Sequence, residues 1–140
     1  MATFFKFQDF SEQLIRGIHD FDAHTFKVYL SNAAPSASLD AVKADLAEIA
    51  AGNGYTAGGN ATTITVAEVT GTTTVSGTEV VFTATGAVGP FQYAVLYNDT
   101  SASKNLVGAW DYGSSISLAT GETFTVKFSN ASPGAILTLV

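Results

Sequence analysis

The segment from Gly89 to Gly113 constrains the fold of this chain more than any other stretch. It consists of two apolar runs separated by Asn98–Asn105, which is rich in residues that favour turns. Period-two alternation makes both faces of the first run apolar, with Phe91, Tyr93, Val95 and Tyr97 on one face and Ala94 and Leu96 on the other. A strand of this kind belongs inside a sheet that is covered on both sides. The segment is therefore predicted to form a β-hairpin at the centre of the core.

The second run of this hairpin contains the only tryptophan of the chain. Alternation predicts one face with Leu106, Gly108, Trp110 and Tyr112, and another with Val107, Ala109 and Asp111. Two aromatic side chains on one strand face can stack on a sugar ring, which keeps a carbohydrate-binding module as an alternative. Their apolar neighbours favour packing in the core instead.

After Thr62 the chain continues to alternate with period two. The alternating apolar positions are Ile64 and Val66, then Val80, Phe82 and Ala84, then Ile116 and Leu118, then Phe124, Val126 and Phe128, and finally the run Ala135–Val140. Turn signals at Ala119–Glu122 and Pro133–Gly134 separate the later runs. With Thr25–Leu30, this pattern predicts about eight short strands. The expected fold is mainly β within the α+β class, as an antiparallel β-sandwich or jelly roll with two short helices.

Both helices are expected in the N-terminal half. The first helix is predicted over Lys6–Ile18, because apolar residues recur there at helical spacing: Phe7, Phe10, Leu14, Ile15 and Ile18. The spacing of Leu39, Val42, Leu46 and Ile49 predicts a second, which begins after an N-cap at Ser38 and ends near Ala51. The first helix either covers the sheet or docks on a neighbouring subunit. The candidate core or interface residues are therefore Phe7, Phe10, Phe91, Tyr93, Trp110 and Tyr112.

The length of 140 residues suits a single domain over 1–140. Residues 1–60 provide helix, strand, helix and a glycine-rich loop, and residues 61–140 provide a β-rich core. Charged residues make up 13% of the chain, against about 25% in an ordinary globular domain. We expect part of this neutral surface to be buried against other protein; a threonine-rich neutral exterior is the alternative.

Several function classes lack the residues they need. The net charge is −6 and the six Lys and Arg are scattered, which argues against binding to nucleic acid or to anionic membranes. The cluster His19–His24 contains two His and two Asp but lacks a zinc-binding spacing, and we interpret it as a polar turn. The glycine-rich loop 52–60 lacks the lysine of a phosphate-binding loop. No nucleophile motif accompanies the two histidines, so we expect no enzyme, no cofactor and no metal.

The chain also lacks a signal-peptide pattern at its beginning and a run of about 18 apolar residues, so we expect synthesis and folding in a cytoplasm without membrane insertion.

Several stretches resemble a family of small structural proteins of tailed bacteriophages. They are Lys6–Phe10, Gly17–His19, Thr25–Pro35, Gly54–Gly59, Gly89–Asp99, Trp110–Ser115 and Gly121–Val126. Together they span most of the chain, and the central hairpin is the most specific part.

The resemblance implies a virion structural protein and carries over no catalytic or ligand-binding residue. We expect a capsid decoration, or cement, protein that binds the major capsid protein on the outer surface of the head, as a homotrimer. A tail, collar or fibre component, with or without receptor binding, is the alternative.

Overall fold

The computed structural model describes residues 2–129 and 133–140. Its elements, in chain order, are β1 (Thr3–Lys6), α1 (Asp9–Ile15), β2 (Phe26–Ser31), the 3-10 turn η1 (Lys43–Asp45), β3 (Asn60–Thr62), β4 (Ile64–Val69), β5 (Thr72–Gly77), β6 (Val80–Thr83), β7 (Val88–Asn98), β8 (Leu106–Leu118), β9 (Thr123–Val126) and β10 (Gly134–Leu139). The expectation of a mainly β fold is confirmed.

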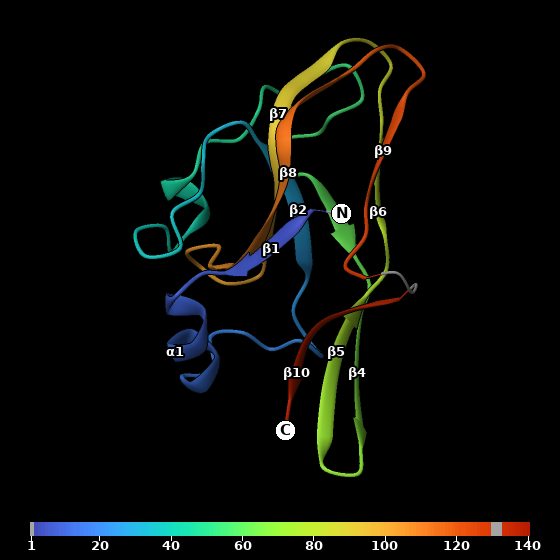
Figure 1. Cartoon of the computed structure of the whole chain (residues 1–140). Coiled ribbons are helices and arrows are strands. Elements are labelled where there is room, and N and C mark those ends of the chain that lie inside the picture. The colour runs from blue at the N-terminus through green and yellow to red at the C-terminus, as the bar shows by residue number, and fades with distance from the viewer. Residues whose placement is uncertain (1, 130–132) are drawn as a thin grey trace.

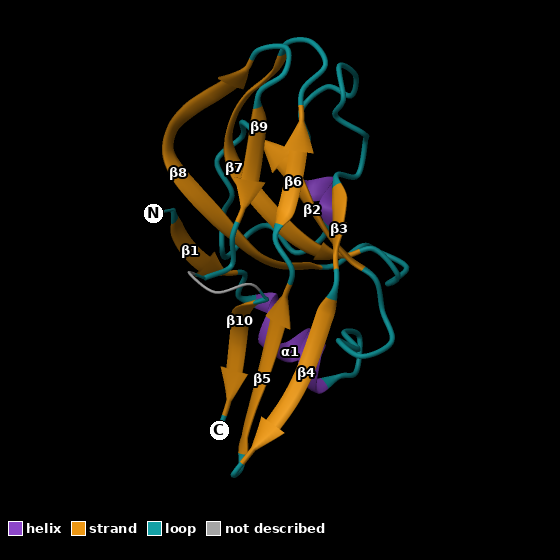
Figure 2. Ribbon diagram, turned by 90° about the vertical axis from the view of Figure 1, so that its right-hand side faces the viewer, coloured by secondary structure: helices purple, strands orange, loops and turns teal. Residues whose placement is uncertain are grey.

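The strands form three sheets in which every pairing is antiparallel. A five-stranded sheet has the order β1-β8-β7-β2-β3, and β6 pairs with β9. The third sheet has the order β10-β5-β4, and we call it the arm. Figures 1 and 2 show that the arm projects from one end of the molecule, whereas β6 and β9 lie opposite the hairpin of β7 and β8.

The predicted hairpin is the centre of the larger sheet, with β7 between β8 and β2. Its two apolar faces contribute to two separate buried clusters. One face of β7 supplies Ala94 and Leu96 to the larger cluster, and the other supplies Val95 and Tyr97 to the smaller one. The reasoning that a strand apolar on both faces is covered on both sides is therefore confirmed for this part of β7.

Two of the expected face assignments are wrong. Phe91 lies in the larger cluster, away from Val95, and the pairing of β7 with β8 is irregular on both sides of Phe91. Leu106 and Trp110 also lie in different clusters. Leu96 pairs with Gly108, whereas the next residue of β7, Tyr97, pairs with Leu106, so β8 has an extra residue at this point. An extra residue in one strand moves the following side chains to the opposite face.

The predicted second helix is absent from the described residues. Only the short turn η1 forms there, and Leu39 is 81% exposed. The side chain of Asp45 accepts hydrogen bonds from the backbone N–H groups of Ala41 and Val42, at 2.9 and 3.0 Å. Val42 instead forms an isolated bridge with Asn105. Such side-chain bonds compete with a helix for the same backbone groups.

The first helix is shorter than predicted. Thr3–Lys6 form the edge strand β1, which pairs with Gly108–Asp111 of β8. The helix α1 then buries Phe10 and Gln13 but leaves Ile15 87% exposed. Another correction concerns Ile116 and Leu118, which were expected in a separate strand and belong to the far end of β8.

Candidate interaction surface

One face of the arm is apolar across all three of its strands. Val66 of β4 lies opposite Val75 of β5, which lies opposite Leu137 of β10. In the next row, Glu68 and Leu139 flank Thr73. Directly opposed residues of antiparallel strands point to the same side of a sheet. The arm therefore presents an apolar strip across its three strands. Toward the tip of the arm, Glu68 and Thr73 interrupt this strip.

This strip faces α1 and the turn after it across an open groove of about 400 Å³. Six apolar side chains line what we call the groove: Leu14, Phe21, Val66, Val75, Leu137 and Leu139. Val75 is buried at its floor, whereas Val66 and Leu139 are 42% and 64% exposed. The groove is thus an unfilled apolar surface of the size of a ligand or side-chain pocket.

Both edges of the arm are also open. Within the described residues, β4 and β10 each pair with β5 alone. Exposed edge strands are usually protected by charged side chains or prolines. Here β4, β5 and β10 carry a single charged residue, Glu68, and no proline. The arm therefore lacks the usual protection against contact with another polypeptide.

The wall of the groove opposite the arm is held by a buried polar cluster. His19 bonds to Gln13 Oε1 through Nε2 (3.1 Å) and accepts from Asn98 Nδ2 at Nδ1 (3.4 Å). The same amide donates to His24 Nδ1 (2.9 Å). The contacts assign to His19 the neutral ring with its hydrogen on Nε2. Burial of the ring, and secondarily the neighbouring His24, lowers the pKa of His19 to about 4.

Two carboxylates lie beside the apolar lining. The side chain of Asp20 accepts the backbone N–H groups of Asp22 and Ala23, both at 3.0 Å, and so closes a tight turn. Asp20 and Asp22 both line the groove, and no Lys or Arg lines it. The charged part of the groove lining is therefore acidic. The expectation of a polar turn over His19–His24 is confirmed, and among the described residues no group of three potential ligands could hold a metal ion.

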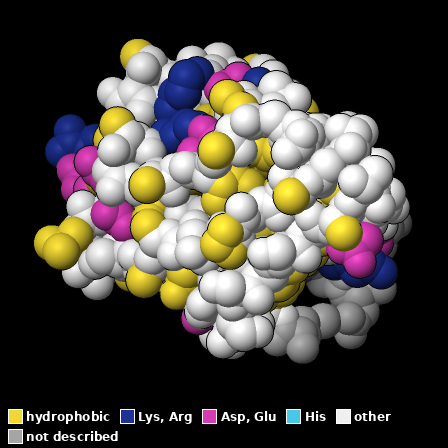
Figure 3. Space-filling model, turned by 90° about the horizontal axis from the view of Figure 1, so that it is seen from above, with side chains coloured by type: hydrophobic (Ala, Val, Ile, Leu, Met, Phe, Trp, Pro, Cys, Tyr) yellow, Lys and Arg dark blue, Asp and Glu magenta, His cyan; other side chains and the backbone are white. Residues whose placement is uncertain are grey.

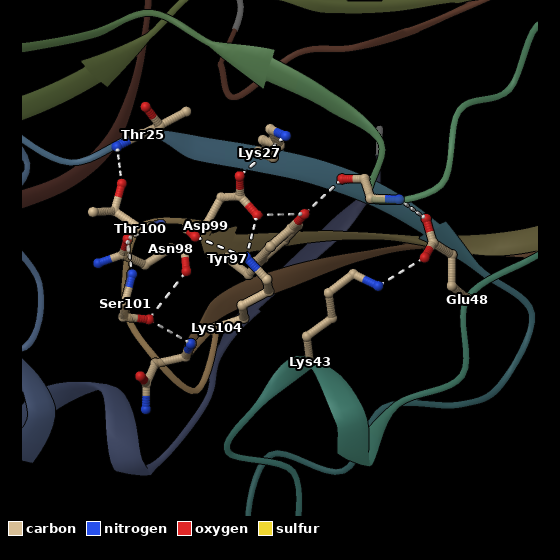
Figure 4. Close-up of polar contacts among 12 residues, drawn as sticks. Thr25, Lys27, Lys43, Glu48, Tyr97, Asn98, Asp99, Thr100, Ser101 and Lys104 are labelled. Carbon is tan, nitrogen blue, oxygen red and sulfur yellow. Dashed lines mark hydrogen bonds and ion pairs between the residues drawn. The ribbon is translucent and has the colours of Figure 1, made fainter.

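Figure 4 shows a second polar network, which fastens the segment between β2 and β3 onto the larger sheet. The carboxylate of Glu48 accepts from Lys43 Nζ (2.7 Å), from the Tyr55 hydroxyl (2.7 Å) and from the backbone N–H of Gly58 (2.6 Å). The Tyr97 hydroxyl donates to the carbonyl of Gly58 at 2.7 Å. These bonds replace the predicted second helix as the support of this segment.

Asp99 completes this network at the loop between β7 and β8. It contacts Lys104 at 2.8 Å and Lys27 at 3.1 Å (Figure 4). The hydrogen bond from Lys104, together with Lys27, holds the pKa of Asp99 below its usual range. Burial raises the pKa of the nearby Tyr97 hydroxyl above its usual range. Both groups are therefore fixed in their ordinary charge states at neutral pH.

None of the six aromatic residues singled out in the sequence lines the groove. Phe7, Phe10, Phe91 and Trp110 are buried, while Tyr93 and Tyr112 are partly buried. The Trp110 ring lies between Phe4 and Phe128, with centroid distances of 4.9 and 5.1 Å. Tyr112 packs edge-on against Phe124 at 4.9 Å. Trp110 and Tyr112 also line a second hollow of about 330 Å³, but Trp110 is only 5% exposed, so its burial favours a packing role.

The groove residues were missed because they come from three distant parts of the chain. Val66 and Leu139 belong to short strands that were predicted, and Phe21 belongs to a turn. One sequence signal was present: the runs around Val66 and Leu137 combine apolar residues with almost no charge. That pattern marks a surface left open for contact when the strands lie at an edge.

Searches of protein-family models, of curated proteins and of solved structures found no match to this chain. Over the described ranges, no helix combines the length and apolarity required to cross a membrane.

Proposed function

We propose that this protein is a structural component of a tailed-phage virion and that it decorates the outer surface of the capsid. In this proposal its partner is the major capsid protein, it acts as a homotrimer, and it performs no catalysis. The sequence resemblance of the central hairpin and the N-terminal segments supplies the virion setting. Synthesis in the host cytoplasm agrees with a chain without cysteines.

The observation that carries the proposal is the projecting arm with its apolar strip and two open edges. Val66 and Leu139 are both exposed on the apolar strip, and contiguous exposed apolar surface indicates a contact with another protein. The whole chain is also poor in charge, with 13% charged residues. On the face seen in Figure 3, charged side chains occupy a few separate places and neutral surface lies between them. Such a surface loses little solvation energy when it is buried in an assembly.

For the body we propose the finer description of a β-sandwich related to jelly rolls. The five-stranded sheet would form one layer, and β6 with β9 would form the other. Phe82 of β6 and Val126 of β9 share a buried cluster with Leu96 of β7, which supports two layers around one core.

Decoration by a trimer explains how a small domain stabilises a large shell. A typical protein–protein contact buries roughly 1,200–2,000 Å² in total. Three linked subunits engage the lattice together, so modest single contacts add through effective concentration. A protein that binds the assembled shell in preference to free subunits raises the temperature at which the shell opens.

The test compares phage particles with and without this protein. Copies per particle and their position are determined by electron cryomicroscopy, and DNA release is followed on heating. Many copies on the head and a higher release temperature are expected. Full occupancy on the head with an unchanged release temperature would contradict a cementing role. A few copies on the tail or collar would select the alternative of a tail component.

A further inference from the structure

We propose that the groove is the capsid-binding site, and that it receives an apolar polypeptide segment of the major capsid protein that carries a Lys or Arg. This deepens the decoration function proposed above and depends on it. The site consists of the apolar strip of the arm, the wall formed by Leu14 and Phe21, and the carboxylates of Asp20 and Asp22.

The apolar part of the groove sets the first requirement on the partner. Val66 and Leu139 on the arm are both exposed to solvent, to 42% and 64%. Val75 between them is already buried, so apolar side chains that enter would contact a complete floor. Removal of this surface from water favours an apolar occupant.

The charges set the second requirement. Asp20 and Asp22 lie at the groove, and none of the six Lys and Arg of the chain lines it. Five of those cations are paired with carboxylates elsewhere, and Lys6 bonds to Ser11. For Asp22, the structure records no ion pair among the described residues. A cation brought by the partner would therefore find unpaired carboxylates, which gives electrostatic complementarity.

The same charges argue against two other occupants. A second copy of this chain carries a net charge of −6, and five of its six cations are already paired with its own carboxylates. A nucleic acid would bring phosphates toward Asp20 and Asp22, which is repulsive. The segment of a different protein with free Lys or Arg fits the groove better than either.

The groove is formed before the partner arrives. On one side, Phe21 stacks on Phe26 with a centroid distance of 4.4 Å and an interplanar angle of 8°. Two backbone bonds to the Asp20 side chain fix the turn that carries Asp22. On the other side, β5 holds both β4 and β10 in register. A preformed site spends less conformational entropy on binding.

The first test changes the apolar strip and uses a closely matched control. Val66→Glu places a charge in the groove, and Val81→Glu places the same charge on β6, outside it. The two valines are 42% and 47% exposed, and both lie in strands. Binding to purified heads that lack the protein is measured as copies per head against free concentration. Val66→Glu is expected to lower the affinity about tenfold or more, and Val81→Glu to leave it within about twofold.

The second test addresses the carboxylates. Asp22→Asn removes one charge from the groove, and Glu122→Gln removes one from the distant turn before β9 while keeping its acceptor for Ala119 N–H. Asp22→Asn is expected to weaken head binding about threefold at low salt, with a smaller effect at high salt. Glu122→Gln is expected to bind as the wild type does.

The outcomes separate this inference from the function on which it depends. If the wild type does not bind heads at all, decoration itself fails. If the wild type binds while Val66→Glu and Val81→Glu bind equally well, decoration stands and the groove is not the site. If native mass spectrometry finds a small apolar molecule that Val66→Glu releases, and head binding is unchanged, the occupant proposed here is wrong. Melting temperatures of all variants establish that each is folded.

Discussion

Acid is expected to destabilise this protein over a pH range that is set by the pKa of one histidine, His19. Neutral His19 donates from Nε2 to Gln13 and accepts at Nδ1 from the amide of Asn98. A second proton would occupy Nδ1 and point at the NH₂ group of Asn98, which cannot accept it. The ring is also 5% exposed, so water cannot solvate the new charge.

The magnitude follows from the two pKa values of His19. The pKa is 6.5 for the ordinary ring and about 4 in the folded protein. Between these values the unfolded chain binds a proton that the folded chain does not, so stability falls as the pH decreases from 6.5 to about 4 and then levels off. At about 1.4 kcal/mol per pH unit, with some solvent screening, the loss is about 2–3 kcal/mol. Asp99 contributes only at lower pH, because its pKa lies below its usual range.

The assay is urea unfolding at a series of pH values between 4 and 7, together with NMR titration of the ring. The chain has only two histidines, so the His24→Gln variant leaves the signal of His19 alone. That variant is expected to keep most of the pH dependence, whereas His19→Gln is expected to remove it. A His19 ring that titrates above pH 6 would refute the reasoning. So would an unchanged pH dependence in the folded His19→Gln variant.

Three further predictions concern packing. Trp110→Ala is expected to cost about 3–5 kcal/mol of unfolding free energy, because Phe4 and Phe128 cover its ring; a denaturant midpoint equal to that of the wild type would show that the ring is not part of the core. Gly59→Ala is expected to cost at least about 2 kcal/mol in the same assay, because φ is +71° and a Cβ would overlap the carbonyl of Val28. The control Gly121→Ala has φ +86° but open space around it, and a cost as large as that of Gly59→Ala would contradict the steric explanation. Deletion of residues 135–140 removes β10 from β5 and is expected to lower the melting temperature and the solubility; wild-type values for both would show that β10 is dispensable.

The sequence was sufficient to predict the elements whose pattern is set by local periodicity. The hairpin of β7 and β8 and the strand β2 follow from alternation of apolar residues over at least six positions. The loop between β7 and β8 follows from its turn-forming residues, and the structure shows why they are suited to it. The Asn98 side chain accepts the backbone N–H groups of Thr100 and Ser101.

Features that depend on tertiary contacts were not predictable in this way. The spacing of Leu39 and Val42 is helical. The local structure is instead decided by the hydrogen bonds that the Asp45 side chain accepts from the backbone and by the bridge between Val42 and Asn105. The register shifts in β7 leave no mark in an apolar run, so the position of Phe91 could not be assigned to a face. The groove depends on the separation of the strands into three sheets, which period-two alternation alone does not specify.

The pairing of β1 with β8 has a consequence for how the protein is made. Lys6 lies opposite Gly108, so β1 has no partner until β8 has left the ribosome. At about 5–20 residues per second, synthesis of the intervening roughly 100 residues takes about 5–20 s. During that time Phe4 and Phe5 are without the strand against which they pair. Completion of the central sheet therefore has to wait for β8, and until then the exposed strand β1 is open to chaperones.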